Sequence, residues 1–395
     1  MDKNKELQIK KQNRIVKKLE PQLNIRFLFI AAILILLLAG MSIFSKREEY
    51  SKKEGRNLNV LPFASADSVI DGSFTSDIDA YVSDSIAFRD MWLEVRNFSR
   101  SILGSKDSGG IYKCSNGYLI EKFNDPGKEK AEEIAETVSE WGMGTNKPDI
   151  YMTAVPTSGY VFSDKLPYGA DAGDQETFLT DLKEAFSATD VNYIDISSTL
   201  RTHKDEEIYF KSDSNWTSLG AYYAYRFIGQ EMELDMSTDN FEAMKVSESF
   251  VGDLAAKSGL SCGQDDINIY FPLDSSFKQV VEYDGVSSSV SPYVSSALKS
   301  NCKRNVFFGG AHSFIRINTS SVSKKTLLVI KDSYGDNFIP FLMVNYREIL
   351  VVDPELYYGD LNELMASQII DDVLILGSTK SLAGNDALIN LLKGE

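Results

Sequence analysis

Continuous apolar runs that alternate with helical patterns are the feature that most constrains the fold of this chain. The runs are short, bounded by polar residues and concentrated beyond residue 125, at 150–155, 193–195, 326–330, 348–352 and 372–376. Helical spacing of apolar residues occurs between them, at 128–143, 174–188 and 216–232, the last with Thr217 as a predicted N-cap. Strands that are apolar throughout are typical of a parallel sheet buried on both faces, so residues 125–395 are predicted to form an α/β domain.

Two segments depart from this alternation. Residues 237–325 are rich in Ser and Gly and are predicted to be an irregular insertion or an elaborated edge of the sheet. Residues 45–124 are predicted to be an N-terminal extension, with an extended stalk at 46–66 and an amphipathic helix, or a pair of helices, at 76–103. A β-hairpin with Asn116-Gly117 at its turn is expected to end this extension.

A charge-free apolar run at 27–44 predicts one transmembrane helix. At about 1.5 Å per residue, its 18 residues nearly cross a hydrocarbon core of about 30 Å. Residues 1–26 form a basic arm with eight cations and three acids, which favours a cytoplasmic N-terminus and an extracellular main domain. Cations on the outer flank, at 46–47 and 52–53, weaken this bias. Cleavage of a signal peptide within 39–42 is the alternative, but the length of the run favours an uncleaved single-pass anchor in the lipid of the cell membrane.

Charge and cysteine content narrow the function classes. The chain carries a net charge of −16 and its first 26 residues carry +5, so residues 27–395 carry −21, which excludes a nucleic-acid partner. A neutral glycan or a small acyl donor suits such a surface better. The three cysteines, Cys114, Cys262 and Cys302, leave at least one unpaired within the chain, and Cys262–Cys302 is one conceivable bridge. We find no zinc-like spacing and no nucleotide-binding loop, so no cofactor or metal is predicted.

The strongest chemical pattern is the apolar strand that runs into Lys331-Asp332-Ser333, with a tight turn at Gly335. Active sites of open α/β sheets lie at the carboxyl ends of the strands, where a serine beside free backbone N–H groups can act as a nucleophile. Asp-Ser after a strand is also a common helix cap, and that interpretation stays open. A second polar segment, at 207–217, places Asp213 and Asn215 on one side of an extended strand, unless it is simply a turn that caps the next helix.

Together these segments resemble the DHHW family of Gram-positive bacteria, relatives of the alginate acetylation proteins in the SGNH hydrolase superfamily. The resemblance covers nearly all of the chain beyond the anchor. It rests on ordered short matches: Glu54-Gly55-Arg56-Asn57, Asp71-Gly72-Ser73-Phe74, Phe88-Arg89-Asp90, Asn116-Gly117-Tyr118-Leu119, Asp164-Lys165-Leu166-Pro167, Phe307-Phe308-Gly309-Gly310 and Lys331-Asp332-Ser333-Tyr334. The resemblance implies a three-layer α/β/α fold with a parallel sheet.

The resemblance also implies a Ser-His-Asp triad, in which Ser333 is the nucleophile and Asp213 the orienting acid. The general base should stand at 215, but this chain has Asn215 there, and Ser214 replaces the first histidine of the motif. An asparagine amide cannot usefully accept a proton, and a serine without a base is a poor nucleophile. Losing the base costs about as much as losing the nucleophile, so efficient triad chemistry is not expected.

Other residues offer substitutes for the missing base. His312 follows a glycine-rich loop that can lie near the site, and Lys331 stands two residues before the serine. His203, in a polar loop, is the weakest of the three. Gly309 and Gly310 are candidates for oxyanion N–H groups. Each residue also has a plain structural interpretation, as a solvated loop histidine, an ion-pair partner at a strand end or an ordinary turn.

Two functions follow from the resemblance. The first is O-acetyl transfer or ester hydrolysis on a cell-surface glycan, beside a multi-spanning membrane O-acyltransferase that supplies the acyl group. The second is a non-catalytic glycan-binding or scaffold protein that keeps the fold but has lost the base. Asn215 favours the second, whereas the retained residues favour the first, namely Asp213, Lys331, Asp332 and Ser333.

Overall fold

The computed structural model describes residues 107–394 apart from 145–147, 239 and 301, together with shorter stretches between residues 29 and 92. The chain divides into two compact units, residues 1–51 with 56–98, and residues 52–55 with 99–395. In the first unit, β1 (Tyr50–Ser51) pairs antiparallel with β2 (Arg56–Asn57). Helix α3 (Ser73–Ser85) lies largely within the segment predicted to be an amphipathic helix.

The predicted membrane anchor is described only in part. Residues 29–30, 32–33, 36–37 and 40–42 are helical, and the rest of 27–44 lies outside the described residues, as do the basic arm at 1–26 and most of the predicted stalk. Among the residues that the structure describes, no helix has both the length and the apolar character needed to cross a membrane. The anchor therefore stays a prediction.

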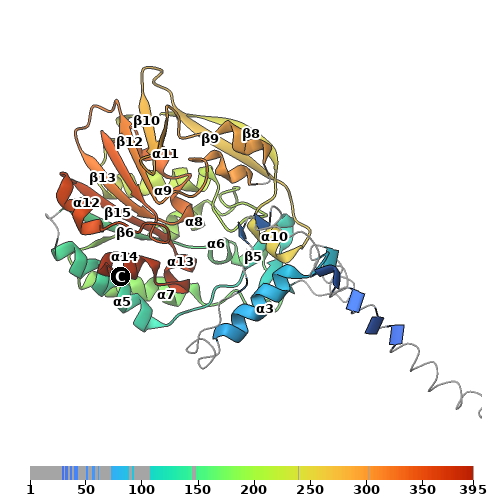
Figure 1. The fold of residues 1–395 in the computed structure, drawn as a ribbon. Helices are drawn as coiled ribbons and strands as arrows, with labels where there is room; N and C mark the ends of the chain where they lie inside the picture. Colours follow the sequence, from blue (N-terminus) through green and yellow to red (C-terminus); the bar gives the residue numbers. More distant parts are fainter. Residues whose placement is uncertain are drawn as a thin grey trace, which may run out of the picture. The chain divides into compact units, whose positions relative to one another are not determined.

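The second unit contains an eight-stranded mixed sheet, whose strands lie in the order β11-β10-β12-β14-β13-β15-β6-β7 (Figure 1). Five neighbouring strands run parallel: β14 (Glu348–Val352), β13 (Thr326–Lys331), β15 (Asp372–Ser378), β6 (Asp149–Val155) and β7 (Asn192–Tyr193). Three more extend the sheet antiparallel: β12 (Phe314–Thr319), β10 (Gln279–Tyr283) and β11 (Ser287–Ser289). The predicted parallel sheet is formed by the first five strands, and the three antiparallel strands make the sheet as a whole mixed.

The apolar runs are continuous because both faces of the sheet are covered. Along β13, Leu327 and Val329 pack into one hydrophobic cluster, whereas Leu328 and Ile330 pack into the other. The same alternation holds along β15. Since successive strand side chains point to opposite faces, a strand between two helical layers must be apolar at every position.

Helices cover both faces of the sheet (Figure 1). One hydrophobic cluster includes side chains of α5 (Lys128–Met143), α7 (Gln175–Ser187), α12 (Leu361–Ser367), α13 (Thr379–Gly384) and α14 (Ala387–Lys393). The opposite cluster includes side chains of α6 (Ser158–Val161), α8 (Ser197–Thr202), α9 (Ser218–Glu231) and α11 (Ile339–Leu342). Short 3-10 turns lie at Ser115–Gly117, Ser163–Lys165, Met236–Thr238, Ser295–Lys299, Lys303–Val306 and Ser333–Gly335. Thr217 caps α9 as predicted, because its hydroxyl accepts the N–H of Gly220.

Residues 237–325 are more regular than their composition suggests. Strand β8 (Phe241–Phe250) pairs with β9 (Asp265–Pro272) in a separate antiparallel ribbon, and α10 (Asp253–Ser258) lies between them in the chain. Strands β10, β11 and β12 join the main sheet. Of the two interpretations that the sequence left open, these three strands support the elaborated edge. Buried positions alternate with more exposed ones along β10 and β12, and β11 has no buried position, so these strands lack the continuous apolar run that marks the parallel strands.

The predicted hairpin at Asn116-Gly117 is confirmed. Strands β3 (Asp107–Ser108), β4 (Ile111–Lys113) and β5 (Leu119–Glu121) form an antiparallel sheet. Asn116 and Gly117 have φ values of 57° and 79°, which is the left-handed conformation that a tight hairpin turn requires. The N–H of Leu119 donates to the carbonyl of Lys211 at 2.7 Å, so the hairpin is joined to the polar loop that carries Asp213 and Asn215.

Candidate functional site

Ser333 stands at the carboxyl edge of the sheet, at the first residue of the 3-10 turn that follows β13. Asp332 caps this turn: one carboxylate oxygen accepts the N–H of Tyr334 at 2.9 Å, and the other accepts the N–H of Ser378 at the end of β15, at 2.8 Å. The serine itself is exposed. Asp332 therefore forms the predicted cap, and Ser333 stays accessible as the candidate nucleophile.

Asn215 contacts Ser333 although 118 positions separate them. The Nδ2 amide of Asn215 donates to Ser333 Oγ at 3.1 Å, and the asparagine side chain is fully buried. Its Oδ1 atom is also buried and has no hydrogen-bond partner among the described residues. Turning the amide would let the oxygen accept a bond from the serine hydroxyl, but neither orientation gives an atom that takes up the proton.

The Asp213 carboxylate accepts hydrogen bonds from the backbone of this loop and not from the side chain of a base. One carboxylate oxygen accepts the N–H of Asn215 and the other accepts the N–H of Asp253, both at 3.1 Å. Burial, together with the charge of Asp253, raises the pKa of Asp213 to about 6, although Arg304 and the two N–H donors oppose the shift. The acid of the implied triad is thus present and buried, and it positions residue 215 through the main chain.

Arg304 is a site residue that the sequence did not indicate. Its Nε lies 3.6 Å from Asp213 Oδ1, and one terminal nitrogen donates to the Ser333 carbonyl at 3.4 Å. The same nitrogen lies 3.9 Å from Asp336. No motif links Arg304 to these residues, and the only signal is its place just before Phe307-Phe308-Gly309-Gly310. It joins the acid and serine segments by charge.

Gly252 is required by the close approach of Asp213. A Cβ atom at this position would lie 2.3 Å from Asp213 Cβ and 2.4 Å from Asp213 Oδ2. We expect Gly252→Ala to lower the free energy of unfolding by about 1–3 kcal/mol, because Asp213 must move from its N–H donors. Urea unfolding of the full chain measures this, with Gly384→Ala as control, since nothing lies within 4 Å of a Cβ there. Equal stability of the two variants would contradict the prediction.

His312 has both ring nitrogens engaged by acceptors. Nδ1 lies 2.7 Å from a carboxylate oxygen of Asp284, and Nε2 lies 3.0 Å from the carbonyl of Phe308. A histidine that serves as a base needs a free nitrogen directed at the nucleophile. In this arrangement neither nitrogen is directed at Ser333.

Lys331 is buried between two carboxylates. Its Nζ lies 2.8 Å from Asp336 and 3.4 Å from Asp353, and its side chain is 2 % exposed. Burial acts to lower the pKa of Lys331, but Asp336 and Asp353 outweigh it and the pKa is raised. A lysine held protonated in this way cannot take a proton from serine, so the ion-pair interpretation describes its contacts.

The remaining predicted residues make other contacts. The N–H of Gly309 donates to the carbonyl of Asn305 at 3.0 Å, and that of Gly310 to the carbonyl of Phe307 at 3.3 Å, so neither is available to an oxyanion as it stands. His203 stacks on Tyr223, with ring centroids 3.5 Å apart, and lies 2.7 Å from Glu206. These contacts give His203 a structural role on α8 and α9.

The structure also bears on the conceivable disulfide and on possible metal-ligand groups. Cys262 packs against a small hydrophobic cluster made of Ile111, Leu119, Leu254 and Ala255, and Cys302 precedes the turn Lys303–Val306. No disulfide joins these two described cysteines. Within the residues that the structure describes, no group of three or more His, Cys, Asp or Glu side chains is arranged to hold a metal ion.

The sequence model of the DHHW protein family matches residues 173–352, a range that includes Asp213, Asn215, Arg304 and Ser333. The resemblance to the DHHW family is confirmed. The resemblance implies that the four name-giving positions correspond to Asp213, Ser214, Asn215 and Trp216, so that the first and the last are kept and both histidines are replaced.

Solved structures are similar to this chain in fold. A DHHW family protein from Eubacterium siraeum has a TM-score of 0.61 and 20% identity, over 73% of this chain and 96% of that chain. PatB1 from Bacillus cereus, in a structure with a sulfonyl adduct, has a TM-score of 0.59 and 17% identity, over 71% of this chain and 99% of that chain. The O-acetyltransferase domain of Pseudomonas putida AlgJ has a TM-score of 0.46 and 14% identity, over 72% of this chain and 99% of that chain. No curated protein sequence matches the chain. The first two likenesses establish the mixed α/β fold.

The tryptophan of the DHHW motif is a core residue in this chain. Trp216 is fully buried, and its indole N–H lies 2.9 Å from the carbonyl of Tyr334 and 2.6 Å from Asn337 Oδ1. Asn337 returns a hydrogen bond to the Trp216 carbonyl at 2.9 Å. The motif segment is thereby bonded to the residues that follow Ser333, which explains how Asn215 and Ser333 are brought together.

Proposed function

We propose that this chain is a membrane-tethered, extracytoplasmic SGNH-like protein of cell-surface glycan O-acylation, in which Ser-His-Asp catalysis is weak or lost. The observation that carries the proposal is the bond from Asn215 Nδ2 to Ser333 Oγ. A triad base accepts the serine proton, whereas in neither orientation of the Asn215 amide does the atom that faces this oxygen take up that proton. The contact therefore lacks the proton acceptor that acyl transfer needs.

The site nevertheless retains a serine and a buried acid. Ser333 is exposed at the carboxyl ends of parallel strands, and Asp213 is buried behind residue 215. Such an arrangement without a base leaves only binding and oxyanion effects. We therefore expect any residual ester hydrolysis to be slow.

No substitute base supports faster chemistry. His312 is engaged by Asp284 and Phe308, and Lys331 is held as a cation by Asp336 and Asp353. The candidates that the sequence offered thus favour weak or lost catalysis. The glycan and acyl classes in this proposal come from the family resemblance.

A non-catalytic role is the second candidate function, and Asn215 is again the observation that favours it. In this role the domain binds the glycan, or acts as a scaffold, beside a multi-spanning membrane O-acyltransferase. The proposed anchor at 27–44 would hold the domain at the outer membrane face, within reach of such a partner. This role does not require Ser333 to react.

The test compares the full-length wild type with Ser333→Ala in the hydrolysis of a chromogenic acetyl ester. We expect the two rates to agree within about tenfold, since a serine without its base adds little to catalysis. Ser198→Ala, which changes an exposed serine of α8, controls for general effects of the substitution. Wild-type turnover that Ser333→Ala abolishes would overturn the proposal of weak catalysis. Loss of surface-glycan acetylation on gene deletion, but not in Ser333→Ala cells, would favour the scaffold role.

A further inference from the structure

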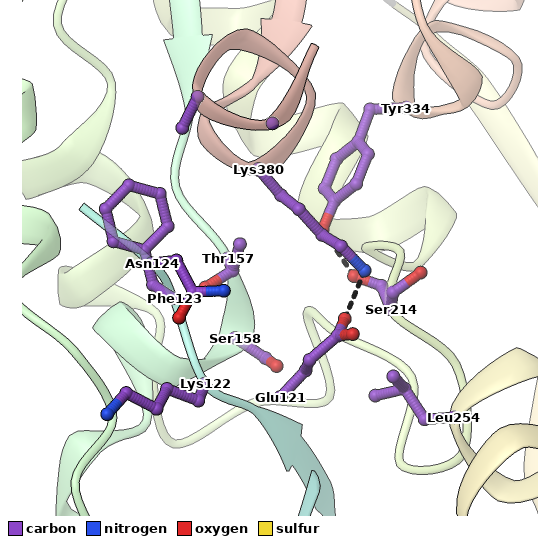
Figure 2. A pocket seen from close by; sticks show the side chains of 12 residues that line it. Glu121, Lys122, Phe123, Asn124, Thr157, Ser158, Ser214, Leu254, Tyr334 and Lys380 are labelled. Atoms are coloured by element: carbon purple, nitrogen blue, oxygen red, sulfur yellow. Dashed lines mark hydrogen bonds and ion pairs between the residues drawn. The ribbon is translucent and has the colours of Figure 1, made fainter. Parts of the chain in front are cut away.

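We propose that a cavity lined by Ser214 and Tyr334, the chain neighbours of Asn215 and Ser333, binds one uncharged pyranose unit of the glycan, an inference that rests on the proposed function. The cavity has a volume of about 190 Å³ (Figure 2). Its walls come from separate parts of the fold: Glu121 at the end of β5, Ser158 just after β6, Lys380 just after β15, and the DHHW segment.

The cavity and the serine site are connected through residues that are neighbours in the sequence. Two of its lining residues are Tyr334, which follows Ser333, and Ser214, which precedes Asn215. The Tyr334 hydroxyl donates to the Ser214 carbonyl, as the dashed line in Figure 2 marks. One wall of the cavity is therefore built from the immediate chain neighbours of the two residues that make the Ser333–Asn215 contact.

The size of the cavity suits a single sugar ring. About 10–15 Å³ of such space is needed to hold one water molecule, so 190 Å³ accommodates on the order of a dozen non-hydrogen atoms. That is the size of one hexose unit. An acetyl group has only three such atoms and would leave most of the cavity empty, whereas two linked hexoses would exceed it.

The lining combines polar and apolar groups in the way that a sugar requires. Glu121 and Lys380 form an ion pair across the cavity, with side chains 27 % and 44 % exposed (Figure 2). The carboxylate accepts and the ammonium donates, so together they can bond hydroxyl groups that do both. Phe123 and Leu254 add apolar surface for the ring face of a pyranose.

The charge balance favours a neutral ligand. The Glu121 and Lys380 charges cancel, and the other cation of the lining, Lys122, is paired with Asp171. A glycan carboxylate or phosphate would have to compete with Glu121 for Lys380. An alkyl chain would leave the polar lining without partners, which costs free energy. A neutral pyranose meets neither penalty.

Binding of methyl pyranosides to the full-length chain tests the inference, with saturation-transfer NMR as the readout. The probes are the neutral methyl gluco-, galacto-, manno- and N-acetylglucopyranosides, with glucuronate and acetate as charged and acyl comparisons. We expect saturable binding of at least one neutral probe. Glu121→Ala and Lys380→Met should each weaken it by about tenfold, because each removes a charged hydrogen-bond partner. Lys183→Met is the matched control, since Lys183 pairs with Asp195 and does not line the cavity.

A second kind of variant tests location without removing a charge. Ala383 lines the cavity from α13, and Ala383→Leu should fill part of it and reduce binding, with folding checked by circular dichroism. The inference is overturned if no neutral probe binds, if glucuronate or acetate binds more tightly, or if these variants match Lys183→Met. Such a failure is distinguishable from failure of the proposed function, because binding is measured without chemistry and ester turnover is measured without a sugar.

Discussion

Replacing Asn215 with histidine is expected to raise the hydrolysis of a chromogenic acetyl ester by about 100-fold or more. A positioned general base contributes about 10²–10⁴ to the rate, and the position already lies 3.1 Å from Ser333 Oγ. Asp213 is held two residues away and is buried beside it, as an orienting acid should be. The measurement is the steady-state rate of the full-length variant against wild type at neutral pH.

Two controls isolate the role of the base. Asn215→His combined with Ser333→Ala should return to the wild-type rate, because the new base then has no nucleophile. Ser214→His restores the other histidine of the motif, but the Ser214 side chain bonds Asp253 rather than Ser333, at 3.2 Å, so we expect no gain. A folded Asn215→His variant without increased turnover would show that more than the base is missing.

Replacing Lys331 with methionine is expected to lower the free energy of unfolding by about 3–5 kcal/mol. The substitution leaves the buried Asp353 without its cation and leaves Asp336 with only Arg304, 3.9 Å away, and the loss of one partner from a buried ion pair has about this cost. Ester hydrolysis should not change by more than the loss of folded protein explains, because Lys331 is not the base. Denaturant unfolding and the ester assay measure the two effects on the same sample.

An exposed lysine provides the comparison. Lys128 pairs with Glu184 at 3.5 Å with both side chains more than half exposed, so Lys128→Met should change stability by less than about 1 kcal/mol. Asp336→Asn and Asp353→Asn added to Lys331→Met should recover part of the lost stability. If Lys331→Met were as stable as Lys128→Met but lost a serine-dependent activity, the Ser–Lys interpretation would replace ours.

Local patterns in the sequence were enough for much of the fold. Helix α5 and strand β14 have the predicted limits, because each is a regular run bounded by polar residues. The turn at Asn116-Gly117 was also predictable, since few residues adopt two consecutive positive φ values. The edge strands β10 and β12 were not, because their alternation of polar and buried residues is weak and their pairing is non-local.

By itself, the sequence determined the α/β class, the serine at the carboxyl end of a buried strand and the replacement of the motif histidines. The first two depend on residue type and short-range periodicity, and the third depends on the resemblance to the DHHW family. Only the tertiary structure decided that Asn215 donates to Ser333, that Arg304 joins Asp213, and that Lys331 is buried between carboxylates. It also decided that the nitrogens of His312 are directed at other partners. The physical reason is that a hydrogen bond or an ion pair depends on the distance and direction between side chains far apart in the chain, and these are settled only when the layers pack.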